Sequence, residues 1–321
     1  MSLAYPFSPE STKSLGKDLS VVIPVFNSVG CLSKLVESLA DELPKIADNF
    51  EVILVNDGSV DSSWRVIVEL AKVYSWIRGL NLMRNYGQHN ALLCGIRAAR
   101  YPITITMDDD QQNPPSEIKK LVSKLVSEEL EVVYGRPIKE EHGLFRNVAS
   151  VLTKLVIKQA LGAKTAPDVS AFRAFNTNIR DAFEKYSSPS VNVDVLLTWG
   201  ASRFGMVLVE HQSRNYQTSN YTFAKLVTHA VNMLTGFSTL PLQLASLNGL
   251  FLIGLGIVLL SYVIIRYLLY GGVVPGFAFL ASITIIFSGS QLMALGIIGE
   301  YVGRIYSRTM DRPSYQIGEQ F

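Results

Sequence analysis

The chain has 321 residues, of which 48% are hydrophobic and 17% are charged. This length accommodates a catalytic domain of about two hundred residues with an appended module, and the apolar share is high for a soluble enzyme. A formal net charge of +2 makes no case for nucleic acid as a partner, and two cysteines make none for a disulfide framework or a thiolate metal site.

Residues 1–18 form a polar N-terminal extension, and residues 19–221 have the mixed charge and the Pro and Gly punctuation of a globular domain. The extension lacks the basic start and apolar core of a signal peptide. We therefore expect the globular domain to stay in the cytosol.

Short β-branched runs alternate with helical stretches after residue 19, which is typical of a mostly parallel sheet covered by helices on both faces. Asn113 is expected to cap the fourth helix, with Pro114 or Pro115 in its first turn. Ligands of such sheets bind beyond the carboxyl ends of the strands, so we expect the chemistry in the loops there. The expected strands are 19–24, 51–56, 78–82, 103–107 and 131–134, and the expected helices are 29–43, 62–74, 88–100 and 116–128.

Two of these loops offer groups to a nucleotide. Phe26 and Asn27 follow the first strand and supply an aromatic wall and an amide. Asp57 follows the second strand, in the segment NDGS, where it can accept the imino proton of a base such as uracil. A plain capped turn is the structural alternative for this second loop.

The segment MDDDQQ, residues 107–112, directly follows an apolar strand. If the extended backbone continues, Asp108, Asp110 and Gln112 face one side and Asp109 faces the other. Two carboxylates on one side form a hard-oxygen site for Mg²⁺ or Mn²⁺, which would bridge the phosphates of a nucleotide-sugar and neutralise the departing diphosphate. A solvated acidic loop is the alternative, which the triplet alone does not exclude.

Two amphipathic segments, residues 144–161 and 223–234, are candidates for helices lying on a membrane surface. For the first, packing on the sheet is an equal alternative. The second falls within residues 222–240, next to a long apolar run, and this position favours the membrane surface.

Residues 241–303 contain two apolar segments, about 244–267 and 277–298, each long enough for a hydrocarbon core of about 30 Å. A short uncharged turn joins them, so the sequence predicts a transmembrane hairpin. Lys225 precedes the first span, and the tail 304–321 is basic, so the positive-inside rule places both ends in the cytoplasm. Glycines in the spans allow close helix approach, which leaves a homo-oligomer possible.

Four segments occur in the order and approximate spacing of the family 2 glycosyltransferases: VIPVFN at 22–27, NDGS at 56–59, RNYGQ at 84–88 and DDDQQNPP at 108–115. More narrowly, the chain resembles the polyprenyl-phosphate glycosyltransferases, which include dolichyl-phosphate mannose synthase and the bactoprenol glucosyltransferases of O-antigen modification. This resemblance extends from about residue 19 through the hairpin. It implies a GT-A α/β catalytic domain over 19–221 that transfers a sugar from a nucleotide-sugar to polyprenyl phosphate.

The resemblance also implies roles for single residues. One departure stands in the metal motif, which often reads Asp-Ala-Asp-Leu-Gln and here has Asp109 and Gln111 at the intervening positions. We expect both to point away from the ion, so the function stays intact. By position, the residues implied to bind the nucleotide and sugar are Pro24, Phe26, Asn27, Asp57, Asn85, Gln88 and Asp108. Those implied to hold the metal diphosphate are Asp108, Asp110 and Gln112. Those implied to lie on the acceptor side are Asp168, Arg173, Arg214, Ser219 and Tyr221.

A lipid phosphate needs no strong general base, because its second pKa near 6 leaves it largely dianionic at neutral pH. Asp168 is therefore either a base or an orienter of a basic side chain or the sugar. Arg214 is expected to grip the acceptor phosphate with paired donors, and a surface ion pair is its alternative. In-line attack on the anomeric carbon would invert its configuration.

The expected donor is UDP-glucose and the expected acceptor undecaprenyl phosphate, at the cytoplasmic face of the inner membrane and in the service of an envelope glycan. Asp57 suits uracil, yet GDP-mannose and UDP-N-acetylglucosamine stay open. A processive polysaccharide synthase is disfavoured because no Gln-x-x-Arg-Trp segment occurs. A non-catalytic, membrane-tethered nucleotide-binding protein would be expected to lose the carboxylates of Asp108 and Asp110.

Overall fold

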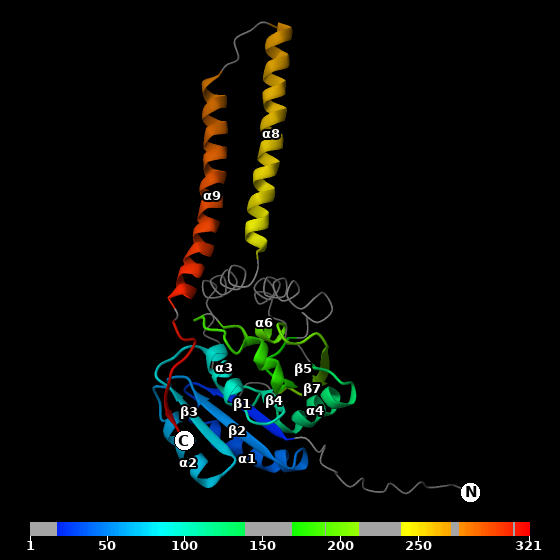
Figure 1. Cartoon of the computed structure of the whole chain (residues 1–321), viewed down its shortest axis with the longest axis vertical. Coiled ribbons are helices and arrows are strands. Elements are labelled where there is room, and N and C mark those ends of the chain that lie inside the picture. The colour runs from blue at the N-terminus through cyan, green and yellow to red at the C-terminus, as the bar shows by residue number, and fades with distance from the viewer. Residues whose placement is uncertain (1–17, 139–168, 190, 212–238, 271–275, 311) are drawn as a thin grey trace, which may run out of the picture. The chain divides into compact units, whose positions relative to one another are not determined.

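Eight strands form one sheet in the computed structural model, which describes residues 18–138, 169–189, 191–211, 239–270, 276–310 and 312–321. The strand order is β7-β5-β6-β4-β1-β2-β3-β8 (Figure 1). Their bounds are β1 Leu19–Val25, β2 Phe50–Asn56, β3 Ile77–Leu82, β4 Ile103–Thr106, β5 Val132–Pro137, β6 Arg173–Asn176, β7 Phe204–Val209 and β8 Ile317–Gln320.

The centre of the sheet is parallel, as predicted: β1 pairs with β2 and β4, and β2 pairs with β3. The flanks are mixed, because β6 runs antiparallel to β4 and β5, and β8 runs antiparallel to β3. The sequence prediction missed β6, β7 and β8. The strands β6 and β8 have four residues each, which is too short for a periodic signal.

The four predicted helices of the catalytic half are present, each shortened at one or both ends. A 3₁₀ turn, Pro115–Glu117, precedes α4, and its N-cap is Pro114 without a side-chain cap bond. The predicted cap at Asn113 is therefore wrong: its Oδ1 lies 3.4 Å from Nδ1 of His211. The helix bounds are α1 Leu32–Glu42, α2 Ser63–Val73, α3 Gln88–Ala98, α4 Ile118–Ser127 and the short α6 Val193–Leu197.

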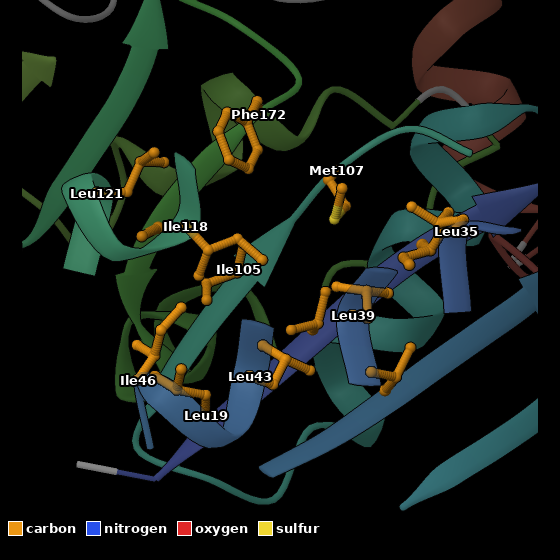
Figure 2. Packing of buried hydrophobic residues seen from close by; sticks show 14 of the residues in the cluster. Leu19, Leu35, Leu39, Leu43, Ile46, Ile105, Met107, Ile118, Leu121 and Phe172 are labelled. Atoms are coloured by element: carbon orange, nitrogen blue, oxygen red, sulfur yellow. The ribbon is translucent and has the colours of Figure 1, made fainter. Parts of the chain in front are cut away.

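Apolar side chains pack on both faces of the sheet. On one face, Leu35 and Leu39 of α1 and Ile118 of α4 pack with Ile105 and Met107 (Figure 2). On the other face, α3 and α6 cover a second buried cluster. All seven residues of β1 are buried, as expected of a central parallel strand. The loops at its carboxyl end therefore stand on a rigid base.

Two long helices, α8 Leu240–Tyr270 and α9 Phe277–Thr309, belong to a second compact unit of the chain. Both are long and apolar enough to cross a membrane, over 240–269 and 283–309 among the described residues. Nδ2 of Asn248 in α8 donates to Oγ of Ser290 in α9 at 2.8 Å, so the two helices form a hairpin. The predicted interfacial segments, 144–161 and 223–234, lie outside the described residues.

The predicted basic tail, residues 304–321, is corrected by the structure. Its first residues continue α9, and its last residues form β8 in the sheet. Nδ2 of Asn90 in α3 donates to the carbonyl oxygen of Ser314 at 2.7 Å. The backbone N–H of Gly79 donates to the carbonyl oxygen of Phe321 at 2.8 Å. The C-terminal segment is thus part of the sheet-containing unit, which we call the sheet unit.

Candidate active site

A cavity of about 250 Å³ opens among the loops that follow β1, β2, β3 and β4. This is the carboxyl edge of the parallel strands, where the sequence placed the chemistry. Most of the residues predicted to hold the nucleotide and the metal line it. The lining residues are Pro24, Val25, Phe26, Asp57, Asn85, Gly87, Gln88, Asp108, Asp109 and Asp110.

Asn27 ties the first two of these loops together. Its backbone, with a φ of 54°, donates to Oγ of Ser59 at 3.0 Å, and its Oδ1 accepts from the N–H of Val60 at 2.9 Å. Asn27 is not among the cavity-lining residues. Its amide oxygen is used to hold the loops, which differs from the predicted contact with a nucleotide.

Asp57 brings the third loop to the cavity. Its carboxylate accepts the backbone N–H groups of Tyr86 at 2.7 Å and Gly87 at 2.9 Å. Burial raises the pKa of Asp57, and these two hydrogen bonds oppose the rise. A carboxylate held in this way stabilises the loop and leaves its remaining lone pairs to a ligand.

Gly58 allows the same loop to come this close. Its φ is +64°, a left-handed conformation, and a Cβ there would lie 2.4 Å from the backbone carbonyl carbon of Arg84 and the nitrogen of Asn85. Any larger residue would collide with that backbone. The pair Asp57-Gly58 therefore encodes the loop contact, which the sequence had indicated only as a turn.

The aspartate triplet does not alternate as predicted. The strand β4 ends at Thr106 and a turn begins at Asp109, so all three aspartates line the cavity. The expectation that Asp109 and Gln111 point away together is wrong. Gln111, with a φ of 60°, donates instead to the carbonyl oxygen of Cys31 at 3.0 Å. The side chain of Gln112 is not among the lining residues, and its backbone N–H donates to Oδ1 of Asp110 at 3.1 Å.

The cavity concentrates negative charge. Burial and the neighbouring Asp110 and Asp109 raise the pKa of Asp108 to about 6, while Arg173 and the hydrogen bond from Gln88 lower it. Nε2 of Gln88 lies 2.6 Å from Oδ1 of Asp108. Because carboxylates this close repel one another, a bound cation would be stabilised here.

The donor set fits a hard divalent ion that shares its coordination with a substrate. Within the described ranges, no group of three or more His, Cys, Asp or Glu side chains is arranged to enclose a metal. Mg²⁺ commonly uses one or two carboxylates and fills its remaining positions with water and substrate phosphates. Asp108 and Asp110 offer that incomplete set.

Arg173 lies inside the protein, where the sequence had suggested the acceptor side. It is 1% exposed and pairs with Oδ1 of Asp194, and its Nε donates to Oγ1 of Thr106 at 2.9 Å. This burial leaves no surface for a lipid phosphate, so a direct acceptor contact does not fit. Asp194 was missed, because a single acidic residue in the apolar run VNVDVLL has no local signature.

Residues 20–186, more than half of the chain, match the family model for glycosyl transferase family 2. The chain belongs to this family. This glycosyltransferase is 34% identical, over 302 residues, to the undecaprenyl-phosphate 4-deoxy-4-formamido-L-arabinose transferase of Proteus mirabilis. The alignment covers 93% of this chain and 92% of the relative. The enzyme of that name from Photorhabdus laumondii is 33% identical over 304 residues, covering 94% and 93%.

A solved structure supports the fold of this family 2 glycosyltransferase. Glucosyl-3-phosphoglycerate synthase from Mycobacterium tuberculosis, in complex with Mn²⁺, UDP and phosphoglyceric acid, aligns with a TM-score of 0.51 and 19% identity. The alignment covers 68% of this chain and 77% of the other. The predicted GT-A fold and the predicted glycosyltransferase class are both confirmed. Four predicted acceptor-side residues lie outside the described residues: Asp168, Arg214, Ser219 and Tyr221.

Proposed function

We propose that this glycosyltransferase moves a sugar from a nucleotide-sugar onto a polyprenyl phosphate at a membrane surface. The proposal rests on one observation: relatives named as undecaprenyl-phosphate sugar transferases match 93% and 94% of the chain. A match of that extent spans both the aspartate-lined cavity and the two apolar helices. This extent supports a catalytic machinery and a means of reaching a lipid in common with those relatives.

In this proposal the donor binds with its diphosphate at the aspartates. Asp108 and Asp110 would hold Mg²⁺ or Mn²⁺, which supplies positive charge for the leaving diphosphate. Asp57 keeps the loop of Asn85 and Gln88 against the cavity, and Phe26, 48% exposed, offers a face to the nucleobase. The protein's own contribution is thus orientation and charge placement, which is the main part of catalysis when the nucleophile is already ionised.

The acceptor phosphate supplies that nucleophile. Its oxygen forms the new bond to the anomeric carbon as the bond to the nucleoside diphosphate breaks, and the configuration inverts. Arg214, with Ser219 and Tyr221, would grip the phosphate, and Asp168 would orient a partner or accept a proton. In Arg214→Ala the KM for the lipid should rise while the KM for the donor stays constant, and an unchanged lipid dependence would contradict this role.

The donor sugar has two candidates. Asp57 at a strand end suits uracil, and the sequence favours UDP-glucose. The names of the relatives favour a nucleotide-linked 4-deoxy-4-formamido-L-arabinose. Purified full-length protein with Mn²⁺ and a polyprenyl phosphate, incubated with each labelled donor in turn, separates the two. Organic-phase label from a single donor names the substrate, and label from GDP-mannose or UDP-N-acetylglucosamine alone would contradict both candidates.

The two apolar helices would anchor the enzyme in the cytoplasmic membrane, with the sheet unit and both chain ends in the cytosol. Lys225, before the first apolar segment, and Arg304, Arg308 and Arg312, after the second, support this orientation. Protease added to sealed inside-out vesicles should remove a C-terminal tag, whereas right-side-out vesicles should protect it. The reverse pattern would overturn the orientation.

A further inference from the structure

A buried ion pair lies beside the end of β4, the strand that leads into the aspartate segment, and no step of the proposed reaction uses it. Arg173 is 1% exposed and Asp194 is 7% exposed. Besides pairing with each other, they bind two neighbours: Nε of Arg173 donates to Oγ1 of Thr106 at 2.9 Å, and the hydroxyl of Tyr134 donates to Oδ1 of Asp194 at 3.2 Å. Ionised groups this deep are retained only when each has a partner.

The strand register explains how this cluster assembles. Thr106 of β4 and Tyr134 of β5 both pair with Arg173 of β6, which lies between them. Residues directly opposite each other on neighbouring strands point to the same face of a sheet. Asp194 comes from α6, which packs on that face. Three strands and one helix therefore converge on the guanidinium.

The same face leads directly to Asp108. Ile105 and Met107 pack in the cluster on the opposite face, so Thr106 and Asp108 alternate with them and lie on the side of Arg173. Gln88, the first residue of α3 on that side, reaches Oδ1 of Asp108. Arg173 lies opposite Thr106 and donates to its Oγ1, so the guanidinium lies two residues along the chain from Asp108 on the same face.

A guanidinium so near would compete with a metal ion. Arg keeps its charge at every working pH and binds carboxylates with paired donors. Free to turn, Arg173 would neutralise Asp108 and occupy the oxygens that a divalent ion needs. The contacts to Asp194 and Thr106 hold it in another direction.

We propose that Asp194 is a positioning residue that holds Arg173 in a buried ion pair and so keeps Asp108 open to the metal diphosphate of the donor. This inference rests on the proposed metal-diphosphate site and deepens it. Asp194 does not line the cavity, so it would act on the ligand only through Arg173.

Calorimetric titration of the purified full-length protein with UDP in the presence of Mn²⁺, at pH 8, tests the inference. Asp194→Asn should raise the dissociation constant about 10- to 100-fold, as loss of an outer-shell partner does at metal sites. In turnover assays the KM for the donor should rise while the KM for the lipid stays unchanged. The double variant Arg173→Met/Asp194→Asn removes the competitor as well and should bind Mn²⁺-UDP within about threefold of the native protein.

The double variant distinguishes positioning from general destabilisation, because a merely structural Asp194 would not be rescued by a second loss. Native affinity in Asp194→Asn, or affinity in the folded double variant as weak as in the single one, overturns the inference. Should Asp194→Asn fail to fold, the double variant decides alone: native affinity supports the inference and weak affinity overturns it. A native protein that binds no UDP with Mn²⁺ would instead overturn the metal-diphosphate site itself, and this inference with it.

Discussion

Leucine, isoleucine and valine have opposite surroundings in the two units of the chain. In the sheet unit Leu39 and Ile105 are 0% exposed, because helices and strands cover them. In the helical unit Ile257 is 60% exposed and Leu250 is 67% exposed. The sheet unit's apolar runs are short and end in polar loops, whereas those of the helices are long and almost free of charge. The length and charge content of an apolar run thus indicate whether protein or lipid covers it.

Removal of one carboxylate charge from the cavity of the sheet unit should greatly lower activity and leave the helical unit unaffected. Asp110→Asn should lower kcat by about 100- to 1000-fold or more, since a charge-stabilising group is lost at the leaving diphosphate. Membrane insertion should not change, because the helical unit is untouched. Asp41→Asn on the exposed side of α1 is the matched control and should retain full activity. Full activity in Asp110→Asn would contradict the metal assignment.

Truncation of one leucine in each unit measures the comparison directly. Leu39→Ala should cost the sheet unit about 2–5 kcal/mol in free energy of unfolding, as cavities in closely packed cores do. Leu260→Ala, at a position 60% exposed, should change that free energy by less than about 0.5 kcal/mol. Denaturant unfolding of the sheet unit in detergent gives both values. Equal losses would mean that the two units share one core.

Two glycine variants test how closely the cavity loops pack. Gly58→Ala should cost about 1–3 kcal/mol, because it strains a left-handed backbone and pushes the Arg84 loop away. Nucleotide affinity should fall with it. Gly30→Ala is the control, since a Cβ at Gly30 meets nothing within 4 Å. Thermal unfolding and UDP titration should separate the two variants, and equal behaviour would remove the packing argument.

The smallest effect expected is a dependence on pH. The raised pKa of Asp108, about 6, means that its proton competes with a cation below that pH. Mn²⁺-UDP affinity should fall about tenfold per pH unit below about 6 and level off above it, because one proton is displaced. In the metal-free protein the raised pKa affects the stability of the fold in the opposite direction. Asp108 stabilises the fold at low pH, and this contribution is lost as the pH rises from 4 through 6. Asp108→Asn should abolish both dependences.

Much of the sheet unit follows from local patterns. Long apolar strands, and loops such as NDGS after them, predict where strands end, and the carboxyl ends of parallel strands meet at one edge. Asp57 and Asp108 are brought together there for that reason. The failures have physical causes too. The turn at Asp109 ends the alternation, and the short strand β8 pairs with a partner more than two hundred residues away in the sequence.

The buried pair of Arg173 and Asp194 shows where sequence reasoning stops. A charged residue that binds a ligand and one that pairs with a counter-ion inside the protein cannot be distinguished from the local sequence. The packing of α6 on the sheet brings Asp194 to Arg173, and the register of β4, β6 and β5 adds Thr106 and Tyr134. The acceptor role suggested for Arg173 came from its place in a motif, and its burial does not fit a direct contact with the acceptor.

We infer that aspartates at the edge of the sheet use a divalent ion to transfer a sugar to a lipid phosphate. The most direct measurement follows label from a nucleotide-sugar into polyprenyl phosphate by the full-length protein, before and after chelation by EDTA. We expect label in the organic phase with Mn²⁺, its loss on chelation and its return when Mn²⁺ is restored. Transfer that persists undiminished in EDTA, or the absence of lipid-linked label with every donor, would contradict the claim.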